Sequence, residues 1–197
     1  MRLTDLVGCW PGLINKELAE TMNTRQTIAK YVLGTLTKRD MVSFAEESVL
    51  NGSDSESMIL LAYESEEAYY VDISTLFERA IRESGIHLPN NEQAAEDRFK
   101  YWLEAIVNGE ISPHEGAKSI YEEVYSIIKA NNNESYVGEC LDIGKIVGAM
   151  YEYDDLQEPY IMYEGKTITK AEADAILNDI VISEAKRLLT KNIPTIA

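Results

Sequence analysis

Residues 112–128 read SPHEGAKSIYEEVYSII, and this stretch shows how most of the chain is organised. The hydroxyl of Ser112 can accept a backbone N–H at a helix start, Pro113 suits the first helical position, and Glu115 can complete a capping box. Apolar residues then recur at helical spacing, at Ala117, Ile120, Tyr121, Val124, Ile127 and Ile128. We therefore interpret His114, next to Glu115, as part of a helix start and not of a reaction centre.

Similar start and stop signals recur along the chain. Helices are predicted after Ser53-Asp54-Ser55-Glu56, Ser65-Glu66-Glu67, Asn90 with Gln93, and Thr169-Lys170-Ala171-Glu172. The second of these is expected to carry Tyr69 and Tyr70 and to end at Gly85, and the third to end at Gly109. A further helix is predicted over residues 134–151, where the four-residue spacing of Gly144 and Gly148 predicts the close approach of a neighbour.

These signals predict an all-α fold. We expect a single-domain packed helical bundle over residues 1–197, with about eight helices. Residues 160–168 combine apolar β-formers with a Glu-Gly turn, which favours a small β-hairpin or an extended loop. The alternative organisation is a looser N-terminal half, residues 1–89, and a helical half, residues 90–197.

Composition and charge exclude several classes of protein. The 197 residues carry a formal net charge of −16, which disfavours binding to nucleic-acid backbones and to anionic membranes. No apolar stretch approaches the roughly 20 residues that span a bilayer, and the N-terminus does not read as a signal peptide. Cys9 and Cys140 do not suggest a disulfide framework, so a cytoplasmic protein is expected.

Three short segments carry a resemblance to other proteins. They are Cys9-Trp10-Pro11-Gly12-Leu13, Gly85-Ile86-His87-Leu88-Pro89 and Gly109-Glu110-Ile111-Ser112-Pro113-His114-Glu115-Gly116-Ala117. In these segments the chain resembles a group of bacterial helical proteins to which no activity is attached. The resemblance implies a bacterial, helical, cytoplasmic protein and implies nothing about catalysis.

No recognisable reaction motif emerges from the residues that usually carry chemistry. His87, His114 and the two cysteines do not stand at zinc-ligand spacing, and neither histidine belongs to a Glu-x-x-His motif. Gly-rich phosphate loops and Gly-x-Ser-x-Gly are absent from the sequence. The sequence therefore predicts no catalytic residue, no cofactor and no metal site.

The distribution of charge is the distinctive feature. Ten acids and no Lys or Arg lie between Arg39 and Arg79. A second stretch without Lys or Arg, residues 146–165, combines acids with tyrosines, which are enriched at protein interfaces. Its candidate partner-binding residues are Tyr151, Tyr153, Asp154, Asp155, Glu158, Tyr160 and Tyr163.

These observations favour a non-enzymatic, acidic protein-binding module, of the type of immunity or antitoxin inhibitors, that masks a basic protein partner. Two alternatives stay open. One is an enzyme whose site is assembled from scattered acids, tyrosines and His87 or His114. The other is an oligomeric structural or regulatory subunit that associates through exposed apolar helix faces.

Overall fold

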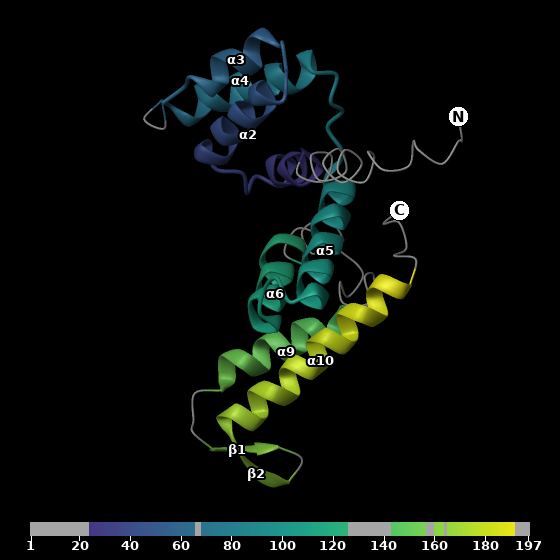
Figure 1. Ribbon diagram of the computed structural model, residues 1–197. Coiled ribbons are helices and arrows are strands. Elements are labelled where there is room, and N and C mark those ends of the chain that lie inside the picture. The colour runs from purple at the N-terminus through teal and green to yellow at the C-terminus, as the bar shows by residue number, and fades with distance from the viewer. Residues whose placement is uncertain (1–23, 66–67, 126–142, 157–159, 164, 192–197) are drawn as a thin grey trace, which may run out of the picture. The chain divides into compact units, whose positions relative to one another are not determined.

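The computed structural model describes residues 24–65, 68–125, 143–156, 160–163 and 165–191, and the predicted all-α fold is confirmed (Figure 1). The chain divides into two compact units, unit 1 with residues 1–89 and unit 2 with residues 90–197. This division falls at Pro89, where the alternative organisation placed it. The single-domain arrangement stays a prediction, and the units are described separately below.

Unit 1 is built from helical residues 24–32 and from helices α2 (Lys38–Leu50), α3 (Glu56–Ala62) and α4 (Tyr70–Glu83). The helices pack around one apolar cluster, which includes Ile28, Met41, Phe44, Met58, Leu61, Ile73, Phe77 and Ile81. Phe77 lies at its centre, with its ring 4.8 Å from that of Tyr31 and 5.8 Å from that of Phe44. Burial of these side chains is the main contribution that stabilises the unit.

The N-terminus of α3 is held by a carboxylate from α4. Ser55 is the N-cap, and its hydroxyl accepts the N–H of Met58. The carboxylate of Glu83 accepts hydrogen bonds from the Ser55 hydroxyl at 2.8 Å, the Ser57 N–H at 3.0 Å and the Ser57 hydroxyl at 2.6 Å. Because these donors favour the ionised form, the bonds from Ser57 and then Ser55 lower the pKa of Glu83 to about 2.

This network predicts an acid dependence of stability. The pKa of Glu83 is lower in the folded protein than in the unfolded chain, so its contribution is present above the ordinary pKa of about 4.5 and is lost as pH falls toward about 2. Glu83→Gln should therefore lower the urea midpoint at about pH 7 and lose most of that difference near pH 2. Glu46→Gln, at an exposed position of α2, is the control. A Glu83→Gln deficit that is equally large at both pH values would contradict the assignment.

The predicted start of α4 is wrong. The helix α4 begins at Tyr70, and Tyr69 takes the N-cap position without a side-chain hydrogen bond, while Glu66 and Glu67 of the predicted start lie outside the described residues. The N–H of Ala68 bonds to the carbonyl of Ser65, and Lys38 Nζ donates to the Ala68 carbonyl at 2.9 Å. A side chain of α2 therefore bonds to the backbone directly before α4.

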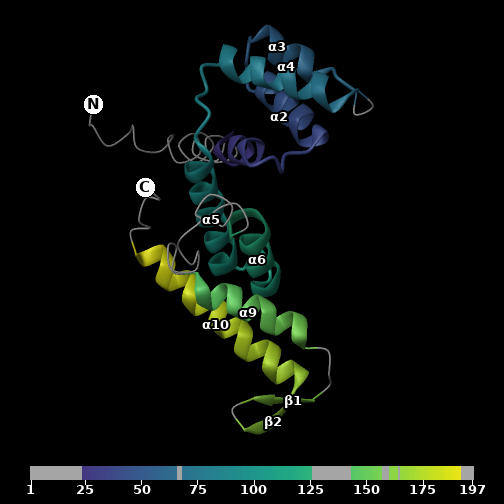
Figure 2. The same cartoon turned by 180° about the vertical axis from the view of Figure 1, so that it is seen from behind.

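Unit 2 contains α5 (Asn91–Asn108), α6 (Pro113–Ser119), the π-helix η1 (Ile120–Tyr125), α9 (Gly144–Asp155), strands β1 (Tyr160–Tyr163) and β2 (Lys166–Thr169), and α10 (Lys170–Thr190). Its buried side chains include Phe99, Leu103, Ile106, Ile120, Val124, Ile146, Met150, Leu177, Val181 and Leu188. Both views show α9 and α10 side by side, with the two strands near the start of α10 (Figures 1 and 2).

Three predicted helix starts in unit 2 are confirmed. Asn90, Ser112 and Thr169 each form a capping box with the residue three positions later. Pro113 is the first residue of α6, and Gly109 ends α5 with a left-handed backbone, φ 72°. The predicted hairpin is also confirmed, because β1 and β2 pair antiparallel from Tyr160 opposite Thr169 to Tyr163 opposite Lys166.

Two other details of unit 2 differ from the prediction. The predicted single helix after Ser112 is α-helical only to Ser119, and residues 120–125 form η1, with residues 126–128 outside the described part of the chain. The predicted close approach at Gly144 and Gly148 is not found among the described residues, since within them a Cβ placed on either glycine would meet nothing within 4 Å. Of the predicted helix at 134–151, residues 134–142 are not described, and α9 extends to Asp155.

Candidate functional site

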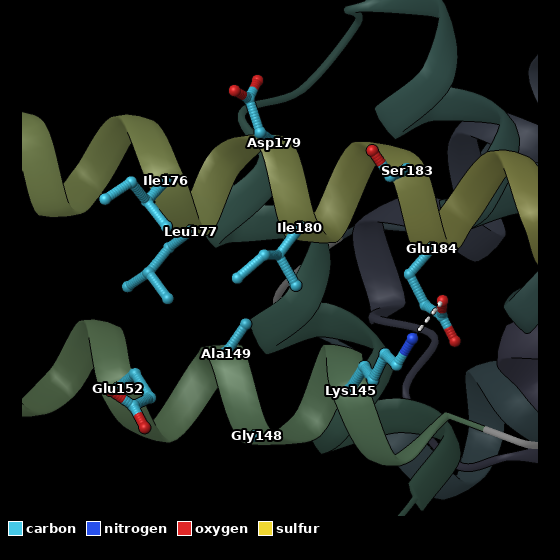
Figure 3. Close-up of a pocket in the computed structure, with 10 residues that line it drawn as sticks. All are labelled: Lys145, Gly148, Ala149, Glu152, Ile176, Leu177, Asp179, Ile180, Ser183 and Glu184. Carbon is cyan, nitrogen blue, oxygen red and sulfur yellow. Dashed lines mark ion pairs between the residues drawn. The ribbon is translucent and has the colours of Figure 1, made fainter. Parts of the chain in front are cut away.

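A groove of about 640 Å³ lies between α9 and α10, within unit 2 (Figure 3). It is lined by Lys145, Gly148, Ala149 and Glu152 of α9 and by Ile176, Leu177, Asp179, Ile180, Ser183 and Glu184 of α10. On each helix these positions recur at spacings of three and four residues, which places them on one face.

The floor of the groove is apolar. Figure 3 shows Leu177 and Ile180 reaching from α10 toward α9, where Ala149 faces them, and Ile176 lying along α10. Gly148 adds no side chain, and no atom of the described residues lies within 4 Å of where its Cβ would be. The floor is therefore a shallow apolar channel between two helices, a surface of the kind that receives the apolar face of a third helix.

A buried carboxylate lies at one end of the groove. Glu184 is 4% exposed, and Arg187, on the next turn of α10, donates to it through Nε at 2.9 Å and through Nη2. Lys145 Nζ lies 3.8 Å from the same carboxylate, as the dashed line in Figure 3 marks. A two-point arginine pair is among the strong charge-assisted interactions, so this end is rigid and its charge is compensated.

Away from the end that holds Glu184, the two edges of the groove carry acidic residues. Glu152 lies on the α9 edge, and Asp179 points away from α9 along the outer side of α10 (Figure 3). Both side chains are exposed. The channel therefore combines an apolar floor with acidic edges, an arrangement that suits an apolar segment flanked by Lys or Arg.

The structure separates the predicted partner-binding residues into different surroundings. Tyr151 is half exposed, and its hydroxyl donates to the Tyr121 hydroxyl at 2.9 Å. Tyr153 is buried instead of lying on a surface, and its hydroxyl donates to Asn178 of α10 at 2.7 Å. Burial, followed by the negative charge of Asp174, raises the pKa of Tyr153 to about 12. Tyr153 therefore supports packing, and Tyr151 is the tyrosine of α9 that a partner could reach.

The other predicted residues lie at or beyond the end of α9. Asp154 and Asp155 are exposed, and Asp154 Oδ1 lies 3.9 Å from His114 Nε2. Tyr160 and Tyr163 are the first and last residues of β1, and Glu158 lies outside the described residues. Prediction from sequence missed Ile176, Ile180 and Asp179, which line the groove from a separate helix.

Each histidine lies in a distinct environment. His114 stacks on the ring of Tyr153, with centroids 4.4 Å apart, which places it against the outer side of the packed core. His87 lines a hollow of about 240 Å³ in unit 1 together with Glu78. The Glu78 carboxylate accepts a 2.6 Å hydrogen bond from Tyr31, and burial together with this bond raises the pKa of Tyr31. The acid in this hollow is thus already engaged by a tyrosine.

Neither a metal centre nor a membrane-spanning helix is present in the described part of the chain. Across the described ranges, no group of three or more His, Cys, Asp or Glu side chains is placed so that it could hold a metal ion. Within the same part of the chain, no helix has both the length and the apolar character needed to cross a bilayer.

No protein-family model matches this chain, and no curated protein or solved structure shows significant similarity to it. The resemblance to bacterial helical proteins stays a prediction. Any function must therefore be argued from the surfaces described above.

Proposed function

We propose that this chain is a non-enzymatic, acidic protein-binding module, and that the α9–α10 groove receives an amphipathic helix of a basic protein partner. The observation that carries the proposal is the apolar floor of Ala149, Leu177 and Ile180 between edges that bear Glu152 and Asp179. A helix with one apolar stripe could bury that stripe on the floor while its Lys or Arg side chains approach the edges.

The overall charge supports a basic partner. At −16, the chain attracts cationic proteins over a distance and repels anionic ones, which raises the rate of association with the former. Masking a basic protein in this way is the role of an immunity or antitoxin protein. Binding of this kind weakens as salt screens the charges.

The groove can be tested by a matched pair of substitutions on one helix. Ile180→Asp places a charge on the apolar floor, whereas Ile182→Asp makes the same change at a half-buried α10 position outside the groove. In low-salt pull-downs from a bacterial lysate, quantified by mass spectrometry, basic proteins retained by the native chain should fall about tenfold with Ile180→Asp. They should be retained by Ile182→Asp.

The acidic edges can be tested separately. Glu152→Lys with Asp179→Lys should slow association and reduce its dependence on salt, while Asp155→Lys, an exposed α9 position that does not line the groove, should have a smaller effect. Retention of the same proteins by all variants, or binding that is indifferent to ionic strength, would contradict the proposal.

A further inference from the structure

Helix α3 in unit 1 is apolar on two opposite faces. Met58 and Leu61 are buried in the core of the unit. On the other side, Ile59 is 38% exposed, Leu60 46% and Tyr63, which follows the helix, 87%. Glu56, Ile59, Leu60 and Tyr63 follow the i, i+3, i+4, i+7 pattern of a single helix face, and we call these four residues the α3 outer face. A helix that is hydrophobic all round is normally covered on all sides.

More exposed apolar side chains lie close by in the sequence. Tyr69, Tyr70 and Val71, at the start of α4, are all exposed, and Leu50 is exposed at the end of α2. Among the described residues, most of the exposed large hydrophobic side chains therefore fall between residues 50 and 71. This concentration is one along the sequence. On a folded protein, exposed apolar side chains that adjoin one another, as on the outer side of α3, are typical of a binding surface, whereas single exposed apolar residues are ordinary.

Along the sequence, the charges among these residues are of one sign, although Arg79 donates to the hydroxyl of Ser57 and Lys38 donates to the carbonyl of Ala68 from outside the stretch. No Lys or Arg occurs between Arg39 and Arg79, while Asp54, Glu64 and Asp72 are exposed beside the apolar positions and Glu56 lies on the α3 outer face itself. A second copy of the chain would bring the same acids opposite one another and is disfavoured by repulsion. The occupant that complements this surface is cationic.

We propose that the α3 outer face is a second docking surface, which binds an apolar, arginine-bearing segment of a different protein. Arginine fits better than lysine, because its planar guanidinium stacks on tyrosine rings and pairs with carboxylates. Tyr63 offers the ring, Glu56 and Glu64 offer the carboxylates, and Ile59 with Leu60 covers the apolar side chains of the segment. This surface belongs to unit 1 and is distinct from the α9–α10 groove of unit 2.

A defined pair of peptides tests the proposal on the full chain. The probe is a fluorescein-labelled amphipathic peptide of about 18 residues, roughly five helical turns, with leucines along one face and arginines on the other. The second peptide replaces every arginine with neutral citrulline. Anisotropy should show binding of the arginine peptide that weakens with salt, and binding of the citrulline peptide at least about tenfold weaker.

Substitutions then locate the bound peptide. Ile59→Ser with Tyr63→Ser should weaken binding of the arginine peptide about tenfold, and Glu64→Gln should weaken it by a smaller factor. Leu88→Ser is the matched control, because Leu88 belongs to the same unit and is 37% exposed, close to the value for Ile59. All substituted positions are exposed, so circular dichroism should show the native helix content in each variant.

The proposal would be overturned by no binding of either peptide, by equal binding of both, by an equal loss with Leu88→Ser, or by a dimer in sedimentation that Ile59→Ser with Tyr63→Ser dissociates. The two proposals fail separately. Loss of arginine-peptide binding with Ile180→Asp alone would place the peptide in the groove and reject the α3 outer face. Loss of arginine-peptide binding only with Ile59→Ser and Tyr63→Ser would support the α3 outer face. The groove would then still be tested by the pull-down with Ile180→Asp.

Discussion

Replacing Glu123 with leucine is expected to destabilise the protein by about 3–5 kcal/mol, the range for breaking a buried ion pair. Arg98 of α5 is 1% exposed, and its Nε donates to Glu123 Oε2 at 2.7 Å. Trp102 Nε1 donates to the same oxygen at 3.1 Å. The substitution removes the carboxylate while the guanidinium stays inside unit 2, where its charge is poorly solvated.

The position offers a close control. Glu122→Leu changes the adjacent residue of η1, which is exposed and forms a surface pair with Lys118 at 3.9 Å. Its effect should stay within about 1 kcal/mol. Urea unfolding followed by circular dichroism would measure both variants. Equal effects of Glu122→Leu and Glu123→Leu would show that the Arg98 pair contributes nothing specific.

Removing both charges should cost less than the sum of the single changes. Arg98→Met keeps much of the side-chain volume, although it gives up the contacts of the guanidinium with the rings of Tyr101 and Trp102, each 4.7 Å away. In the double variant no charge is left buried without its partner, so the coupling energy between the two sites should be about 1–3 kcal/mol. Strict additivity would argue against a direct pair.

The same ion pair explains why the helix after Ser112 was only partly predictable. The capping boxes at Asn90, Ser112 and Thr169 are formed by residues three positions apart, so the sequence alone contains all their determinants. The π-helix is different, because it lies where Glu123 meets Arg98, a residue 25 positions earlier. Local periodicity contains no information about that contact. The start of α4 was missed for a related reason, since Lys38 of α2 bonds to the Ala68 carbonyl directly before the helix.

The candidate sites were also only partly predictable from the sequence. Acids and tyrosines at residues 151–163 suggested one surface, but residues two apart on a helix point in nearly opposite directions, so Tyr153 is buried while Tyr151 is exposed. The sequence does contain a pattern that indicates the groove. Ile176, Leu177, Ile180 and Val181 form an apolar arc wider than one packing partner requires, and its excess becomes the groove floor. Tertiary packing decides which part of this apolar arc stays uncovered, and the sequence of α10 alone does not show it.

The second large predicted effect is a loss of stability at Gly116. The spacing of Gly144 and Gly148 predicted a close approach at those two positions, whereas the close approach is found at Gly116. Gly116→Val should destabilise the protein by about 1–3 kcal/mol through overpacking. A Cβ at Gly116 would lie 2.6 Å from Ile106 Cδ1 and 3.0 Å from Ile111 Cδ1, well inside normal contact distance. Ile106 is itself buried, so it cannot swing into solvent to make room. Thermal or urea unfolding would measure the loss.

Gly148→Val is the matched control, because it makes the same change within a helix where a Cβ meets no atom of the described part of the chain within 4 Å. Valine has a slightly higher helix propensity than glycine, so this variant should be as stable as the native chain or more stable by a few tenths of a kcal/mol. The same substitution at two glycines of one unit would then differ in its effect on stability by about 1–3 kcal/mol. A large loss at Gly148 would instead mean that another part of the chain packs against α9 there, and the groove would not be open to a partner.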